Sequence, residues 1–287
     1  MKYTYNENGE RGLQLVLDNS SIDSYRRCPK KYELSVLHGW QPKSRAQATS
    51  FGSAFHKGME IYDIAMCEYK PHSVAMQEAI LGACRYFSGV EPDSYRNIEN
   101  LVRSIVWYFE EYGENPLQPI TLPDGDWAIE QRFEVPLVGA YNLSLRVDKI
   151  VHYNGKFYVH DYKTTETTIG PGFFNKYSTD SQVSAYCWAM EKVGIPVAGF
   201  IIDAVQVAVG FNRFVRHIET RDKWQLDEWY DDTVSWVGLM EHSWRKDHYI
   251  RNHSSCFNCD FKGICGRAPN MRDSFLSADF IQNLEVK

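Results

Sequence analysis

Long hydrophobic runs are absent from this chain of 287 residues. The most apolar stretch, residues 200–211, is interrupted by Asp203 and Gln206. It is far shorter than the roughly 20 apolar residues that a membrane-spanning helix needs. The first residues also lack the apolar core of a secretory leader, since Glu7, Asn8 and Glu10 lie there. We therefore expect an intracellular protein without a membrane span.

An excess of basic charge is missing as well. Lys and Arg together number 31 against 37 Asp and Glu, which gives a formal net charge of -6. A global positive field for nucleic acid is thereby excluded, so any DNA binding has to be local. Hydrophobic residues make up 44% and charged residues 24%, which is typical of globular proteins and excludes a disordered or fibrous chain.

The spacing of apolar residues predicts a helical first part and a mixed second part. No internal repeat or low-complexity tract interrupts this pattern. A short helix is expected to begin at Ser20 or Ser21 and to end at Pro29. Further helices are expected at 51–69, 73–87, 95–112, 180–193 and 222–244. Strands are expected at 127–136, 141–153, 157–164, 197–209 and 211–220. The tail at 253–266 is expected to be a loop folded around a ligand.

An Asn-Gly pair at 154–155 predicts a tight hairpin, because these residues accept the positive φ values of a two-residue type I′ turn. If Tyr153 pairs with Lys156, the register places Asp148 directly opposite Asp161. Directly opposed like charges destabilise a sheet. A divalent cation compensates for this repulsion, since Mg²⁺ is commonly bound by one or two carboxylates.

A lysine completes the pattern on the same strand face. Lys163 follows Asp161 by two residues, and the same register places it opposite Arg146. A metal ion beside two aspartates and a lysine predicts phosphodiester hydrolysis. The ion polarises the phosphate and activates water, while the ammonium orients that water or stabilises developing charge. The alternative interpretation is a solvated face with an ordinary Asp and Lys pair.

Two more residues are candidates for the same site. His56 lies near the start of the helix expected at 51–69, where it is either a further metal ligand or an ordinary helical histidine. Glu130 lies in the strand expected at 127–136. It either faces the same site or is an edge-strand carboxylate exposed to water.

This set of residues resembles the RecB-like branch of the PD-(D/E)XK nucleases in order and spacing. The resemblance runs from Ser20 to about Cys265, and it is closest to the iron-sulfur members, such as the CRISPR-associated exonucleases, the AddB nuclease domain and phage homologues. One departure is Leu145, where relatives usually place a glycine three residues before the metal-binding aspartate. The residues that carry the resemblance are His56, the strand with Asp148, Asp161-Tyr162-Lys163-Thr164 and Gln182-Val183-Ser184-Ala185-Tyr186.

The resemblance implies a role for each of these residues. It implies Mg²⁺ or Mn²⁺ as the catalytic ion and DNA, as single strands or duplex ends, as the substrate. Metal binding is implied for His56, Asp148 and Asp161, assistance to the nucleophilic water for Lys163, and organisation of the site and the DNA for Gln182 and Tyr186.

The resemblance also implies the fold and the biological setting. The expected fold is α/β (α+β), with a restriction-endonuclease-like mixed sheet flanked by helices. A helical cap is expected over 1–125, the nuclease core over 126–220, and a C-terminal helix with a cysteine clasp over 221–287. The expected function is exonucleolytic cleavage in recombination, repair, replication or phage DNA metabolism, in the cytoplasm of a bacterial, archaeal or phage-infected cell. The alternative is a non-catalytic DNA-binding adaptor of a recombination or CRISPR adaptation complex.

Three of the seven cysteines form the pattern Cys256-x2-Cys259-x5-Cys265, which is one ligand short of a tetrahedral metal site. Spacing alone leaves two choices for the fourth ligand: His253 in a zinc site, or Cys28 in a zinc or iron-sulfur site. The resemblance favours Cys28 and a 4Fe-4S cluster, because iron-sulfur relatives place one cysteine before the nuclease core and three after it. Its expected role is structural, as a clasp that ties the two ends of the domain together.

The remaining cysteines and the cations beside Cys28 complete the set of candidates. Cys67, Cys84 and Cys187 are expected to be small buried hydrophobic residues. The basic residues near Cys28 are expected to contact DNA phosphates, although a solvated face would carry the same charges. These basic residues are Arg26, Arg27, Lys30 and Lys31.

Overall fold

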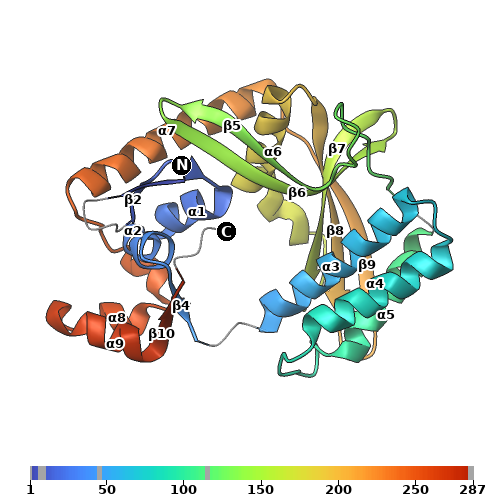
Figure 1. Cartoon of the computed structure of the whole chain (residues 1–287), viewed down its shortest axis with the longest axis horizontal. Coiled ribbons are helices and arrows are strands. Elements are labelled where there is room, and N and C mark those ends of the chain that lie inside the picture. The colour runs from blue at the N-terminus through green and yellow to red at the C-terminus, as the bar shows by residue number, and fades with distance from the viewer. Residues whose placement is uncertain (1, 6–10, 44–46, 114–116, 284–287) are drawn as a thin grey trace. The chain divides into compact units, whose positions relative to one another are not determined.

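The computed structural model describes residues 2–5, 11–43, 47–113 and 117–283 (Figure 1). The chain divides into two compact units, which are described separately. The first unit comprises Met1–Ser44, Glu134–Leu145 and Asp227–Lys287. The second unit comprises Arg45–Phe133 and Arg146–Leu226.

A mixed sheet forms the centre of the second unit. The hairpin strands β6 and β7 are antiparallel, and their turn residues Asn154 and Gly155 have φ values of 49° and 76°, as a type I′ turn requires. Strand β7 is parallel to β8, and β8 is antiparallel to β9. Helix α6 lies in the crossover that the parallel pair needs. The bounds are β5 (Ile129–Val138), β6 (Tyr141–Tyr153), β7 (Lys156–Thr165), α6 (Ser181–Lys192), β8 (Val197–Val207) and β9 (Asn212–Glu219), with a 3-10 helix, η2, at Phe173–Thr179.

Helices α3 (Gln47–Cys67), α4 (His72–Phe87) and α5 (Ile98–Tyr112) form a hydrophobic core with Tyr162, Val205 and Val207 of the sheet. Three fully buried alanines lie four residues apart on α4, so α3 and α4 approach closely. A Cβ added to Gly58 of α3 would lie 3.1 Å from the Cβ of Ala83. Phe55 of α3 packs edge-on against Tyr162 of β7 at 5.7 Å between ring centroids. The alanines are Ala75, Ala79 and Ala83.

Short elements make up most of the first unit. Strands β1 and β2 pair with each other, β4 pairs with β10, and β3 runs parallel to β6 at residues 142–143. A small core joins Leu34 to Phe261, Ile264, Leu276 and Phe280. The strands are β1 (Tyr3–Tyr5), β2 (Arg11–Gln14), β3 (Val16–Leu17), β4 (Trp40–Pro42) and β10 (Phe280–Gln282). The helices are α1 (Asn19–Arg27), α2 (Pro29–Tyr32), α8 (Lys262–Cys265) and α9 (Arg272–Asp279).

Helix α7 (Lys223–Arg245) supplies most of its length to the first unit. Its carbonyl at Leu239 accepts a hydrogen bond of 2.7 Å from the Tyr25 hydroxyl of α1. Short helical turns complete the unit at Glu33–Leu37, His253–Cys256 and Pro269–Met271. Across the described ranges, none of the helices combines the length and apolarity that a membrane crossing requires.

The predicted fold class is confirmed: a central mixed sheet is flanked by helices, and α3 contacts β7, α5 contacts β9 and α6 contacts β8. Two local predictions are wrong. Helix α1 is capped by Asp18, whose carboxylate accepts the Ser21 amide at 2.8 Å, and not by Ser20 or Ser21. The predicted loop at 253–266 contains η3 (His253–Cys256) and α8.

Candidate metal centre

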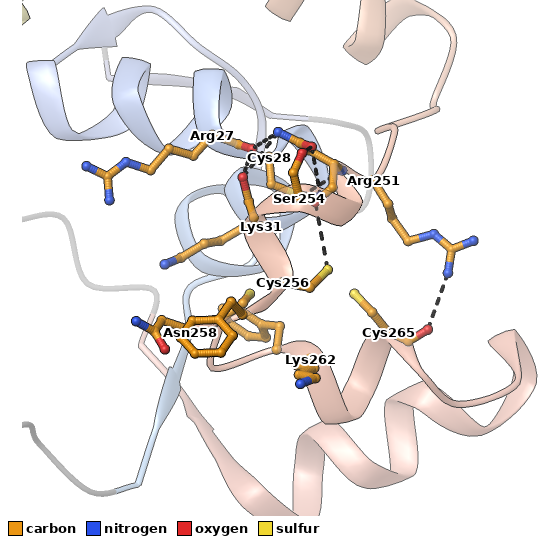
Figure 2. A pocket seen from close by; sticks show the side chains of 14 residues that line it. Arg27, Cys28, Lys31, Arg251, Ser254, Cys256, Asn258, Lys262 and Cys265 are labelled. Carbon is orange, nitrogen blue, oxygen red and sulfur yellow. Dashed lines mark hydrogen bonds between the residues drawn. The ribbon is translucent and has the colours of Figure 1, made fainter.

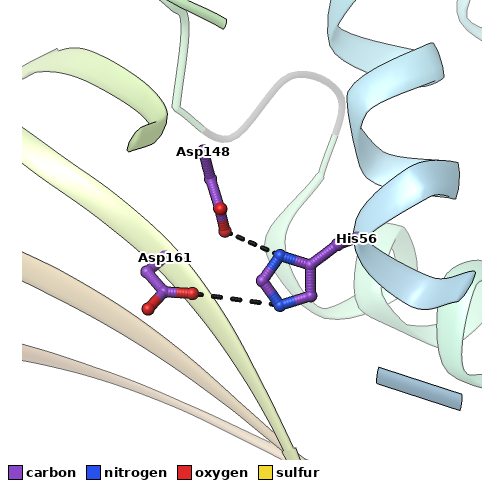
Figure 3. Close-up of side chains that lie close together, drawn as sticks. All are labelled: His56, Asp148 and Asp161. Atoms are coloured by element: carbon purple, nitrogen blue, oxygen red, sulfur yellow. Dashed lines mark ion pairs between the residues drawn. The ribbon is translucent and has the colours of Figure 1, made fainter. Parts of the chain in front are cut away.

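Three side chains from three elements of the second unit meet in one place (Figure 3). His56 comes from α3, Asp148 from β6 and Asp161 from β7, and one ligand atom of each lies within 4.8 Å of the others. The His56 Nδ1 is 2.8 Å from Asp148 Oδ2, and its Nε2 is 3.9 Å from Asp161 Oδ1. The structure therefore brings these three candidate residues together.

The ladder between β6 and β7 follows the predicted register as far as the pair Lys149 and His160. Asp148 and Asp161 are the next residues in the predicted register, but they lie one position beyond the end of the paired ladder. The Tyr162 amide instead donates to Asp148 Oδ2 at 3.4 Å. The two carboxylates still face the same histidine, because the alternation of the strands places them on one side.

The histidine is placed as a cation. Its Nδ1 faces a carboxylate oxygen of Asp148, and its Nε2 donates to the Tyr162 carbonyl at 2.7 Å. Only a doubly protonated imidazole donates from both nitrogens. Burial lowers the pKa of His56, but the charges of Asp148 and Asp161 outweigh it and raise the pKa to about 9. The same ion pair holds the pKa of Asp148 well below its usual range despite burial.

Asp161 is the most buried member of the triad, with 9% of its side chain exposed. Burial, followed by the nearby charge of Asp148, raises the pKa of Asp161 to about 6. Lys163 forms an ion pair with this carboxylate. Burial lowers the pKa of Lys163, but the attraction of Asp161 outweighs it and raises that pKa above its ordinary value. The lysine ammonium is therefore fixed beside the triad.

Helix α6 places both of its candidate residues against this region. Asp180 caps the helix and accepts the Gln182 amide at 2.7 Å. The Gln182 side-chain oxygen accepts a hydrogen bond of 3.4 Å from Lys163 Nζ. The Tyr186 hydroxyl donates to the backbone carbonyl of Arg146 at 2.6 Å. Gln182 thus contacts the lysine, and Tyr186 contacts the backbone of the strand that carries Asp148.

A cavity of about 540 Å³ opens beside the triad. Glu130 lines it, so the first of the two interpretations of this residue holds. Burial and the charge of Asp148 raise the pKa of Glu130 to about 7. Arg146 is not paired with Lys163 as predicted, because the ladder has already ended, and its Nε lies 2.6 Å from Glu130 Oε2. The cavity is lined by Gly52, Ser53, His56, Lys57, Glu60, Tyr86, Glu130, Arg146 and Asp148.

Sequence reasoning missed four side chains of this cavity, the first of which is Ser53 on α3. Lys57 and Glu60 form an ion pair at 2.8 Å on α3, next to His56. Their spacing of three residues on the predicted helix could have revealed the pair. Tyr86 reaches the cavity from the end of α4, and nothing in its sequence context distinguishes it from a surface residue.

The four cysteines of the predicted clasp line one cavity of the first unit, of about 270 Å³ (Figure 2). The sulfurs of Cys256 and Cys265 point toward each other in this view. Burial, followed by Cys259 and Cys28, raises the pKa of the Cys265 thiol. His253 is exposed and does not line the cavity, whereas Cys28 does.

The distances between the cysteine sulfurs can be compared with those around a single zinc ion. Thiolates on one zinc ion lie about 3.8 Å apart, given a Zn–S distance of about 2.3 Å. Within the described ranges, no three cysteine sulfurs lie within 4.8 Å of one another. All seven cysteines are free, so no described pair forms a disulfide.

Of the four basic residues predicted to contact phosphate, two line the cysteine cavity and two have other partners. Arg27 and Lys31 line the cysteine cavity. Arg26 instead lies over the Trp236 ring at 5.7 Å, and Lys30 forms an ion pair with Glu33. The three cysteines outside the cluster have thiol pKa values raised by burial, and they differ in exposure: Cys187 is buried, whereas Cys67 and Cys84 are half-buried.

Fold and site together define a nuclease of the restriction-endonuclease-like class. The model of the PD-(D/E)XK nuclease superfamily matches residues 19–266, and the chain belongs to this superfamily.

Among solved structures, the chain is similar in fold to a candidate exonuclease from Eubacterium rectale. The TM-score is 0.55 at 13% identity, and the match covers 88% of this chain and 89% of that one. The protein SSO0001 aligns with a TM-score of only 0.32 at 17% identity, over 75% of this chain and 84% of that one, which is too weak to carry an argument. No curated protein matches the chain in sequence.

Proposed function

We propose that this protein is a metal-dependent DNA exonuclease of the RecB-like branch. The observation that carries the proposal is the gathering of His56, Asp148 and Asp161 within 4.8 Å, beside a lysine bound to the last of them. One imidazole and two carboxylates are donors suited to Mn²⁺ or Mg²⁺. His56, Asp148 and Asp161 would hold the ion, which would polarise the phosphate and lower the pKa of a bound water.

The other residues of the site prepare it for hydrolysis. Lys163 remains charged because of Asp161, and it can orient the attacking water or stabilise negative charge that develops on the phosphate. Gln182 limits the movement of the ammonium through its hydrogen bond. Tyr186 fixes the backbone of β6 two residues before Asp148. The electrostatic environment is therefore set before substrate arrives.

Cleavage of end-labelled DNA with Mg²⁺, Mn²⁺ or EDTA tests this proposal. Asp161→Asn and Lys163→Ala should each lower the rate by about 100- to 1000-fold, the usual loss when one preorganised electrostatic group is removed. Lys156→Ala is the matched control, because this lysine is exposed at the far end of the same strand. Loss of the label as mononucleotides supports an exonuclease. Full activity of Asp161→Asn, or DNA binding without metal-dependent cleavage, would favour the adaptor instead.

We also propose that Cys28, Cys256, Cys259 and Cys265 hold a 4Fe-4S cluster with a structural role. Their shared cavity supports this assignment, and no three of the described cysteine sulfurs lie as close together as the ligands of one zinc ion would. Anaerobically purified protein should be brown and contain iron and acid-labile sulfide, and Cys28→Ser should lower both. Zinc as the sole metal would contradict the assignment.

The biological setting follows from the proposed reaction. DNA with free ends, single-stranded or duplex, is the proposed substrate, and recombination, repair, replication or phage DNA metabolism is the proposed process. Such a nuclease acts in the cytoplasm, where proteins of recombination, replication or CRISPR adaptation would be its partners.

A further inference from the structure

The cavity beside the triad carries more polar groups than metal binding uses. Its volume of about 540 Å³ lies within the range of about 300–1,000 Å³ that is typical of sites for small organic groups. Arg146, Glu130 and Tyr86 line it, and none of them belongs to the triad. These side chains supply a cation, a carboxylate and an aromatic ring at one place.

Arg146 is suited to bind a phosphate next to the metal site. It lies two residues before Asp148 on β6, and 60% of its side chain is exposed. Among the described residues, Glu130 is its one acidic partner, and this ion pair uses the Nε of Arg146. A guanidinium has five N–H donors, so its terminal amino groups can bind two oxygens of one phosphate.

Glu130 positions this arginine. Only 18% of its side chain is exposed, and its Oε2 lies 2.6 Å from Arg146 Nε. Its φ of 52° lies in the left-handed region, which residues other than glycine rarely adopt. Residues under such backbone strain gather at functional sites. The strained backbone thus directs a carboxylate at Arg146 inside the cavity.

Tyr86 supplies an exposed aromatic surface at the end of α4. Its side chain lines the cavity and is 49% exposed, although it is large and apolar. Aromatic side chains of this kind bind bases of single-stranded nucleic acid by stacking. In a duplex, a base is already stacked and paired, so its release costs free energy.

We propose that this cavity binds the nucleotide next to the scissile phosphate of a single DNA strand, with Arg146 on a phosphate, Tyr86 stacked on the base and Glu130 positioning Arg146. This inference rests on the proposed nuclease function and names its substrate class. Single-stranded ends are then better substrates than blunt duplex ends, since only the former offer an unpaired base.

Steady-state kinetics on an oligothymidylate with Mn²⁺ test the role of Tyr86. Tyr86→Ala should raise KM by between about 5-fold and about 150-fold, the range for loss of one stacked base. Tyr86→Trp should restore it, because an aromatic surface is what the base needs. Tyr69→Ala is the control, because this tyrosine is 90% exposed and does not line the cavity. An unchanged KM for Tyr86→Ala, or equal cleavage of blunt duplex and single strands, would overturn the inference.

The same assay tests the roles of Arg146 on β6 and Glu130 on β5. Arg146→Ala should raise KM, and Arg146→Lys should not restore it, since lysine lacks the bidentate geometry. Arg132→Ala is the control, because Arg132 is exposed on β5 outside the cavity. Glu130→Gln should raise KM in the wild-type background but not further in Arg146→Ala, as expected of a residue that acts through the arginine. Additive effects would overturn the positioning role.

A small substrate separates this inference from the proposed function. Bis(p-nitrophenyl) phosphate contains a cleavable phosphodiester without any nucleotide. If the wild-type protein cleaves this ester while Tyr86→Ala and Arg146→Ala leave KM for the oligothymidylate unchanged, the cavity inference is wrong and the nuclease function stands. If the wild-type protein cleaves neither compound with Mn²⁺ or Mg²⁺, the nuclease function itself is wrong.

Discussion

Metal binding should release a proton from His56. The two ring nitrogens face Asp148 Oδ2 at 2.8 Å and the Tyr162 carbonyl at 2.7 Å. Both partners are acceptors, so the ring is an imidazolium, and its pKa is raised to about 9 by the two aspartates against the effect of burial. A histidine that ligates a metal is neutral. Binding near neutral pH therefore displaces about one proton.

The pH dependence of Mn²⁺ affinity follows from the pKa values of His56 and Asp161. Each pKa unit corresponds to about 1.36 kcal/mol, so the affinity for Mn²⁺ should rise about tenfold per pH unit between about pH 7 and about pH 9. At about pH 7 it should be about 100-fold below its limit at high pH. Below about pH 6, the dependence should steepen toward about 100-fold per unit, because Asp161, with a pKa of about 6, then has to lose a second proton.

Isothermal titration calorimetry in buffers of different ionisation enthalpy measures the protons released. The wild-type protein and a His72→Gln control should release about one proton per Mn²⁺ near neutral pH. His72 is a suitable control because it lies on α4 and contacts the Tyr62 hydroxyl, outside the triad. His56→Gln should bind more weakly and release almost none. Tight binding by the wild-type protein without proton release would refute the argument.

Two further predictions concern the scaffold behind the site. Lys149 is 1% exposed and its Nζ lies 2.9 Å from Asp63 Oδ2, so Lys149→Met should cost about 3–5 kcal/mol in urea unfolding, and Asp63→Leu in the same chain should recover most of it. An unchanged urea midpoint for Lys149→Met would contradict this. Burial lowers the pKa of His160 to about 4 despite Asp203. Because this pKa lies below the ordinary 6.5, neutral His160 contributes stability above about pH 6.5 that is lost as pH falls toward 4. The wild-type protein should therefore lose more stability than His160→Asn between about pH 7 and about pH 5, and parallel losses would contradict the assignment.

Much of the site could be predicted because one turn sets its register. The Asn-Gly pair at 154–155 accepts the positive φ values of a type I′ turn, and this two-residue turn fixed the pairing of β6 with β7. The alternation of strand side chains then placed Asp148 and Asp161 on one face. His56 could be placed on a helix by apolar periodicity, but its position against the strands came from the family resemblance, since periodicity carries no information on distant contacts.

The parts that could not be predicted depend on contacts between distant segments. Asp203 interrupts an apolar strand and is buried against His160 of β7 and Arg216 of β9. The short loop at 208–211 sets the register of β8 with β9, but the apolar pattern of one strand carries no information on the contact with His160. The strands of the first unit are too short for a period of two residues to be detected. The Glu130 and Arg146 pair depends on a left-handed backbone residue that its sequence does not indicate.

Anomalous diffraction from crystals soaked in Mn²⁺ tests most directly whether the three residues form a metal site. The account predicts one strong peak within coordination distance of His56, Asp148 and Asp161, which Asp161→Asn should weaken or remove. An ordered Mn²⁺ bound by other residues, or no ion at the triad under conditions in which Mn²⁺ supports DNA cleavage, would contradict it.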